Sequence, residues 1–201
     1  MSAKTYVLRI ELKEINPVIW RRFAVPADIT LDRLHDVIQI IMGFNDSHLH
    51  EFNIGGKRYT EEPDPEFIEE GEEILEEGLF KLNDLVKLKD NPFGYLYDFG
   101  DNWGHAVILE KTDYRLKDYD LPVICLDGKR ACPPDDVGSI PGYEEFCKAM
   151  ADKSHPEHKM YKAWFGKLYK PDFIDIEFIN DELSKYIRWS RQRTNPYEFN
   201  Y

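Results

Sequence analysis

The chain has 201 residues, which is enough for one domain with a hydrophobic core that needs no disulfide or structural metal. Its composition, 42% hydrophobic, 14% aromatic and 32% charged, is typical of a globular protein and excludes collagen-like and wholly disordered chains. The formal net charge of −12 would repel nucleic acids and anionic lipids if it were spread evenly over the surface.

Two strands are predicted at the start of the chain. Apolar and charged residues alternate over residues 6–12, which is the period of a half-buried strand. Asn16-Pro17 interrupts this pattern, and residues 18–25 form the next predicted strand. Because the connection is short, we expect the two strands to pair as an antiparallel hairpin.

A helix and a third strand follow the hairpin. Apolar residues at helical spacing predict a helix over residues 31–41, with Thr30 as its N-cap and Gly43 as its left-handed stop. The next predicted strand covers residues 48–54, and a glycine turn leads from it into a short return strand over 57–60.

Most of the negative charge lies in one segment. Residues 61–77 contain ten acids and neither lysine nor arginine, so the other 184 residues carry a net charge of only −2. Blocks of like charge are usually solvated, and we therefore expect a single domain over residues 1–201 with an acidic insertion loop at about 61–77. Docking of a basic partner or loose cation binding is the alternative role for this loop. It lacks the ligand spacing of an EF-hand.

The second half of the chain changes from strands to helices. Residues 81–88 fit a short helix or a strand, and strands are predicted over 95–99 and 103–111. The remaining predicted elements are a short strand over 123–126 and a loop rich in proline and glycine over 131–143. Three helices are predicted after them, over 143–151, 158–165 and 181–191. Early strands and late helices indicate an α+β fold, a mainly antiparallel sheet (roll or partial barrel) with one early helix and a helical C-terminal third.

The cysteines and the hydropathy pattern indicate a cytoplasmic protein. Cys125, Cys132 and Cys147 cannot all pair within the chain, and none belongs to a paired-cysteine metal motif, so we expect reduced thiols. The N-terminus shows no signal-peptide pattern, and no stretch approaches the ~20 apolar residues of a membrane helix, so no membrane partner is expected.

Two consecutive arginines lie on the second predicted strand. The side chains of Arg21 and Arg22 should therefore point to opposite faces. Either their long stems cover apolar neighbours, or one guanidinium binds an acidic group. That group would be Asp98 or Asp101 of the chain itself, or a carboxylate or phosphate of a ligand.

Three histidines and two acids are candidate metal ligands. His48 and His50 lie two apart on a predicted strand, so their rings should share one face. His105, Asp98 and Asp101 come from the later hairpin, and with the two histidines they would make a site of the sort that zinc or iron accepts. Because this spacing is not diagnostic, we predict structural histidines and no metal or other cofactor.

We expect these stretches to form a single binding surface. The loop over 131–143 would join it, since prolines and glycines constrain its backbone. Asp135 or Asp136 would by default cap a turn there. The candidate surface residues are Arg21, Arg22, His48, His50, Tyr97, Asp98, Asp101, Trp103, His105, Asp135 and Asp136.

Motifs of several enzyme and nucleic-acid-binding classes are absent. The chain has no phosphate-binding loop, no dinucleotide fingerprint, no zinc-protease motif and no serine-hydrolase elbow. Cys132 has no neighbouring histidine in the sequence, so we do not expect it to act as a thiolate nucleophile. Arg188, Arg191 and Arg193 are explained by the negative end of the last helix dipole. Nucleic acid is thus not the expected partner, although the near-neutral remainder of the chain does not exclude it.

Four of these stretches, in this order, resemble the Ri-plasmid ORF-three-like family, also labelled insertion-sequence passenger or TnpR-like proteins. They are PVIWRRFAVP, LHDVIQIIMGF with HLHEF, YDFGDNWGH and GKRACPPDDVGSIPGY, and the resemblance runs from Tyr6 to about Leu183. Family members commonly carry glutamate and glycine where this chain has Asp135 and Ser139. The resemblance implies an α+β domain, found alone or attached to other modules, with no established activity.

Recombination, which one family label suggests, does not fit the residues. A serine recombinase needs an activated serine among several arginines, and of the six serines only Ser190 has arginines beside it, near a predicted helix end. We therefore expect a cytoplasmic binding or adaptor domain without catalysis of its own, whose partner is a protein or a small ligand. The alternative is a metal-dependent hydrolase that uses the His/Asp cluster.

Overall fold

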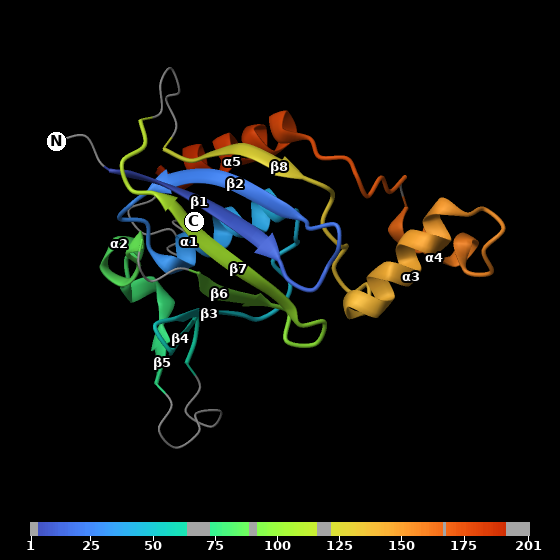
Figure 1. The fold of residues 1–201 in the computed structure, drawn as a ribbon, viewed down its shortest axis with the longest axis horizontal. Helices are drawn as coiled ribbons and strands as arrows, with labels where there is room; N and C mark the ends of the chain where they lie inside the picture. Colours follow the sequence, from blue (N-terminus) through green and yellow to red (C-terminus); the bar gives the residue numbers. More distant parts are fainter. Residues whose placement is uncertain (1–3, 64–72, 89–91, 116–121, 167, 192–201) are drawn as a thin grey trace, which may run out of the picture.

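The fold is organised around one open sheet of eight strands, in the order β5-β4-β3-β6-β7-β1-β2-β8 (Figure 1). The structure is a computed structural model that describes residues 4–63, 73–88, 92–115, 122–166 and 168–191, the last five by their backbone alone. The strands are β1 Thr5–Leu12, β2 Trp20–Pro26, β3 His50–Ile54, β4 Lys57–Thr60, β5 Ile74–Glu76, β6 Phe93–Tyr97, β7 Trp103–Lys111 and β8 Ile124–Lys129. All pairs are antiparallel except β4–β5. The predicted α+β fold with a mainly antiparallel sheet is confirmed.

The helices follow the predicted distribution, one early and the others late. They are α1 Leu31–Met42, the single turn η2 Glu77–Leu79, α2 Leu82–Leu85, α3 Ser139–Ala151, α4 His158–Phe165 and α5 Ile176–Arg191. α1 and α5 pack against each other behind the sheet, whereas α3 and α4 lie beside its end (Figure 1). None of the described helices has the length and apolar character that a membrane-spanning helix needs.

The core forms between one face of the sheet and α1. Alternate residues of β1, such as Leu8 and Ile10, are fully buried, and they share this core with the apolar stripe of α1. Arg9 and Glu11 lie between them and bond to each other at the partly exposed opposite face. Burial of each large apolar side chain contributes about 1.5–3 kcal/mol to the free energy of folding. The opposite face of the central strands carries the polar residues that alternate with the buried ones. We call this face the open face.

The ends of two helices differ from the prediction. α3 begins at Ser139 rather than at Tyr143, because a proline such as Pro141 is tolerated in the first turn of a helix. α5 begins five residues before the predicted Asp181. There the Asp175 carboxylate accepts a hydrogen bond from the amide of Phe178 at 3.0 Å, which is an N-cap that the sequence analysis missed.

The ends of α1 are partly as predicted. Gly43 ends the helix in the left-handed region, with φ of 89° and its amide donating to Gln39 O. Thr30 stands at the N-cap, but its side chain forms no capping hydrogen bond. The following strand starts at His50 rather than at His48, so His48 lies in the loop that precedes the strand.

The acidic segment is described only at its ends. Residues 64–72, the middle of the expected loop, lie outside the described residues. Ile74–Glu76 forms β5, which pairs in parallel with β4, and Glu77 is buried in η2. The end of the segment therefore contributes a strand and a buried carboxylate to the fold.

Candidate functional site

Three loops that are far apart in the sequence meet at one end of the sheet. They are residues 43–49, which follow α1, residues 98–102, which join β6 to β7, and residues 131–139, which lead into α3 (Figure 1). We call this meeting point the three-loop junction. Most of the sequence-predicted surface residues belong to it or border it.

Carboxylates of one loop bind backbone amides of another at the junction. Asp135 Oδ2 accepts a hydrogen bond from Asn45 N at 2.8 Å, and Asp101 Oδ2 accepts one from Gly138 N at 3.0 Å. A hydrogen bond to a charged group contributes about 1.5–3 kcal/mol. These two aspartates therefore hold the three loops together, in addition to any role in binding.

Asp98 is fixed within the β6–β7 turn. Its backbone is left-handed, with φ of 58°, a conformation that aspartate adopts more readily than most residues. One carboxylate oxygen, Oδ1, accepts hydrogen bonds from Gly100 N at 2.9 Å and Asp101 N at 3.1 Å. The other oxygen, Oδ2, lies 3.7 Å from His48 Nε2.

His48 lies between two carboxylates of different loops. Its Nε2 is 3.1 Å from Asp136 Oδ1 and 3.7 Å from Asp98 Oδ2. This nitrogen is buried, yet it is not aligned for a hydrogen bond with any described group. One donor atom from each of these three residues lies within 4.8 Å of the other two. We call His48, Asp98 and Asp136 the His48 cluster.

Two neighbours of the cluster are buried. Tyr97 packs edge-on against the ring of His48 and donates a hydrogen bond to Asp135 Oδ2 at 3.5 Å. The Oδ1 atom of Asp135 is buried and has no hydrogen-bond partner among the described residues. Burial raises the pKa of Asp135 above the usual value for an aspartate.

His48 packs against Tyr97 and His50 against Tyr95, both on the buried face of β6, but His50 lies deeper in the core. As the first residue of β3, His50 points into the core, where its Nε2 lies 2.9 Å from Glu77 Oε1. Its ring stacks on that of His35, with centroids 3.4 Å apart and planes 9° from parallel. Both histidines are buried and lie outside the His48 cluster.

A closed ring of hydrogen bonds around His35 fixes the first loop of the junction, and the sequence analysis missed it. Asp46 N donates to Gln39 Oε1 at 3.0 Å, and Gln39 Nε2 donates to the Tyr95 hydroxyl at 2.9 Å. His35 joins Tyr95 to Asp46 through its two ring nitrogens, at 2.8 Å and 2.7 Å. The available signal was the spacing of His35 and Gln39, two polar residues one turn apart on the apolar stripe of α1.

Trp103 and His105 are buried in the core, and Trp103 also lines the cleft described below. Both lie on the buried face of β7, and His105 packs against Phe44 and Tyr95. Burial lowers the pKa of His105 from 6.5 to about 3, so this ring is neutral near pH 7.

The two arginines lie on opposite faces of β2, as predicted, but neither reaches Asp98 or Asp101. Arg21 is buried, and its Nε donates to Ile41 O, the last turn of α1, at 2.7 Å. A cation at this end also interacts favourably with the helix dipole. Arg22 forms an ion pair with Glu110 at 2.5 Å.

The three cysteines are free, and none is poised as a nucleophile. Burial raises the pKa of Cys125 to about 11 and also raises the pKa values of Cys132 and Cys147. Thiols of this kind are largely protonated at neutral pH and react slowly.

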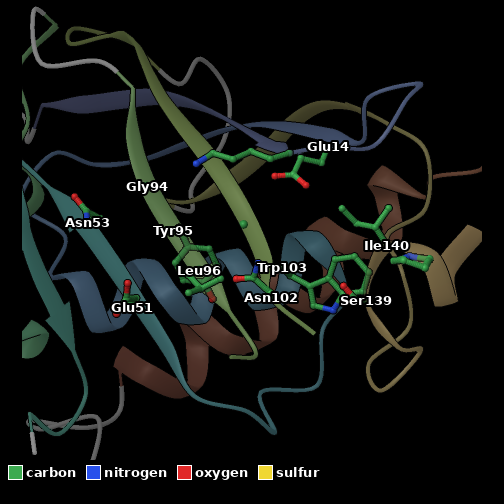
Figure 2. Close-up of a pocket in the computed structure, with 13 residues that line it drawn as sticks. Glu14, Glu51, Asn53, Gly94, Tyr95, Leu96, Asn102, Trp103, Ser139 and Ile140 are labelled. Carbon is green, nitrogen blue, oxygen red and sulfur yellow. The ribbon is translucent and has the colours of Figure 1, made fainter. Parts of the chain in front are cut away.

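A cleft of about 590 Å³ on the open face adjoins the junction (Figure 2). Few side chains cover the floor of the cleft, because glycines, Gly94 and Gly104, lie there on the neighbouring strands β6 and β7. Figure 2 shows Glu51 on one side of it and Ser139 on the other, with Asn102 between them. Asn102 and Ser139 also belong to the junction, so a bound molecule could contact both.

The chain is similar to known proteins over nearly its whole length. A family model described as "Plasmid pRiA4b ORF-3-like protein" matches residues 4–178. Uncharacterized protein y4hQ of Sinorhizobium fredii (strain NBRC 101917 / NGR234) is 34% identical, over 96% of this chain and 100% of that protein. The crystal structure of the protein of unknown function MM3350 from Methanosarcina mazei Go1 superimposes with a TM-score of 0.77 at 37% identity, covering 88% of this chain and 98% of that one.

Proposed function

Because the chain belongs to the plasmid pRiA4b ORF-3-like family, whose compared members carry no activity in their names, we propose a function from its geometry alone. The protein is a binding domain without catalysis of its own, and the three-loop junction is its recognition surface. The observation that supports this proposal is the convergence of three separate loops, tied together by carboxylate–amide hydrogen bonds.

The chemistry of the junction favours a ligand with a positively charged group. Asp136 is exposed, and Asp101, which belongs to the same junction, is half-buried. Two exposed apolar side chains, Leu49 and Phe99, come from the same loops. Acidic groups bordered by apolar ones are typical of a recognition surface, where apolar contact gives affinity and charge gives specificity. A protein segment or a small molecule would fit this description.

The test compares two acid-to-alanine substitutions. Asp101→Ala removes a junction carboxylate, whereas Asp84→Ala removes an exposed carboxylate on α2, away from the junction. Immobilised wild type and both variants are exposed to cell extract, and the bound proteins and small molecules are identified by mass spectrometry. We expect a set of ligands that the wild type and Asp84→Ala retain and Asp101→Ala loses.

Retention of the same set by a correctly folded Asp101→Ala variant would show that the junction is not the recognition surface. Because Asp101 also binds Gly138 N, the thermal unfolding of both variants is measured first. If Asp101→Ala unfolds at a lower temperature, the capture experiment is carried out well below that temperature.

A metal-dependent hydrolase is the second candidate, since the His48 cluster brings one imidazole and two carboxylates together at an accessible place. The larger set of candidate ligands named from the sequence does not assemble, because His50 and His105 are buried elsewhere. Hydrolysis of activated phosphate and carboxylate esters is assayed with added Zn²⁺ or Mn²⁺. A binding domain gives no turnover, whereas turnover that Asp136→Ala abolishes would favour the hydrolase.

A further inference from the structure

The donor atoms of the His48 cluster have the spacing of ligands around one metal ion. Adjacent ligands about 2.0–2.2 Å from a metal ion lie about 3.3–3.6 Å from each other in tetrahedral geometry and about 2.8–3.1 Å in octahedral geometry. His48 Nε2 lies 3.1 Å from Asp136 Oδ1 and 3.7 Å from Asp98 Oδ2. Small rotations of side chains would therefore place all three donors on one ion.

The hydrogen bonding of His48 Nε2 distinguishes a metal ligand from a member of an ordinary ion pair. A protonated imidazole 3.1 Å from a carboxylate oxygen would normally direct its N–H along that line. Nε2 is instead buried without an aligned hydrogen bond to Asp136 or to any other described group. A buried polar nitrogen without a partner is costly, and a metal ion between the three donors would remove this cost.

The charges of the cluster also favour a cation. Asp98 is almost fully buried, and Asp136 lies close to the same imidazole. Within the described part of the chain neither carboxylate pairs with a lysine or an arginine. Asp135 precedes Asp136 in the same loop, and its buried Oδ1 has no hydrogen-bond partner among the described residues. A divalent ion would neutralise the two carboxylates that face His48.

The ligands are held in place by their surroundings. The turn amides of residues 100 and 101 bind one oxygen of Asp98 and leave the other toward His48. The hydrogen-bond ring through His35 fixes Asp46, two residues before His48. Sites with pre-positioned ligands lose little conformational entropy when the ion binds.

From these observations we propose that the His48 cluster binds one divalent transition-metal ion through His48 Nε2, Asp98 Oδ2 and Asp136 Oδ1. One imidazole and two carboxylates suit Zn²⁺ or Mn²⁺, whereas Ca²⁺ takes six to eight oxygen ligands. The proposal deepens the proposed function, because it places a specific cation on the same recognition surface. Three protein ligands also leave a position at which the ion contacts a further ligand.

The test is a calorimetric titration of chelator-treated protein with Zn²⁺ and with Mn²⁺. We expect one ion per chain for the wild type with at least one of these ions. Loss of an outer-shell partner already weakens metal binding about 10–100-fold, so His48→Ala and Asp136→Ala should each weaken it at least about tenfold. His155→Ala is the matched control, since His155 pairs with Glu145 and lies outside the cluster. It should bind the ion as the wild type does.

Failure to bind either ion, or equal binding by all three variants, would overturn the proposal. If His48→Ala does not fold, Asp136→Asn decides, because residue 136 is exposed and its substitution leaves the core intact. A parallel capture experiment with a chelator present separates this proposal from the proposed function. Ligand capture that persists without metal supports the junction as a recognition surface. The titration alone then tests whether the His48 cluster binds a metal ion.

Discussion

Burial decides what each histidine of this protein can do. His48 keeps access to the surface at the junction, whereas His105 is enclosed by Phe44 and Tyr95 and has a pKa of about 3. In the unfolded chain His105 would take up a proton below about pH 6.5. Between these two values the unfolded state binds more protons than the folded state, so the free energy of unfolding must fall as the pH falls.

The pH dependence gives a first prediction, for His105→Leu. From pH 7 to about pH 4.5, the His105 contribution should lower the free energy of unfolding by about 2–3 kcal/mol. The His105→Leu variant should lack this part of the loss, since leucine has no proton to bind. Urea unfolding of both proteins at the two pH values measures the difference. Parallel pH profiles would contradict the assignment of His105 as a neutral core residue.

Glu77 gives a second prediction, because this acid at the end of the acidic segment is buried. Its carboxylate is buried against His50 Nε2, so Glu77→Ala should lower the free energy of unfolding by about 3 kcal/mol. Glu73→Ala is the control, since Glu73 forms an exposed ion pair with Lys57. Its loss should cost less than about 1 kcal/mol. Equal effects in chemical unfolding would show that Glu77 is solvated like its neighbour.

The contrast between these two acids shows what the sequence alone does not contain. Composition identifies the acidic segment, and like-charge blocks are usually solvated. Which acid is buried depends on the position of His50, at the start of β3, which pairs with β6. That pairing is tertiary, so no local pattern around residue 77 could reveal it.

The elements of regular structure were easier to predict than their ends. Alternation predicted β1 and helical spacing predicted α1 almost residue for residue, because these patterns reflect which face is buried. Prolines and glycines before Tyr143 suggested a loop, but the helix starts at Ser139. Gly142 is required there, since a Cβ atom at this position would lie 2.1 Å from Val137 O.

The start of α3 leads to a third prediction. Ser139 has φ of 64°, in the left-handed region, where a residue with a Cβ atom costs about 1–2 kcal/mol relative to glycine. Ser139→Gly should therefore raise the free energy of unfolding by up to about 1 kcal/mol. Ser47→Gly is the control, because Ser47 does not have positive φ and glycine there should destabilise by increasing the entropy of the unfolded chain. A loss of stability in both variants would contradict the prediction.

At the scale of the whole molecule, the order of the strands creates the junction. β7 pairs with β6 on one side and with β1, almost a hundred residues away, on the other. The turn between β6 and β7 is thereby brought beside the loop after α1 and the loop before α3 (Figure 1). The sequence indicated which three stretches to compare, but Asp136 rather than Asp101 or His105 completes the cluster because of this long-range arrangement.

The one-sided packing of the sheet gives the last prediction, which uses two neighbouring residues of β7. Leu109 faces α1 and is buried, whereas Ile108 is only half-buried at the open face. Leu109→Ala should lower the free energy of unfolding by about 2–5 kcal/mol, because it removes buried methyl groups and leaves a cavity. Ile108→Ala removes a side chain of the same size and should cost less than half as much. Urea unfolding of the two variants is the measurement, and similar losses would mean that the open face is covered in solution. In that case the cleft in Figure 2 would not be available to a ligand.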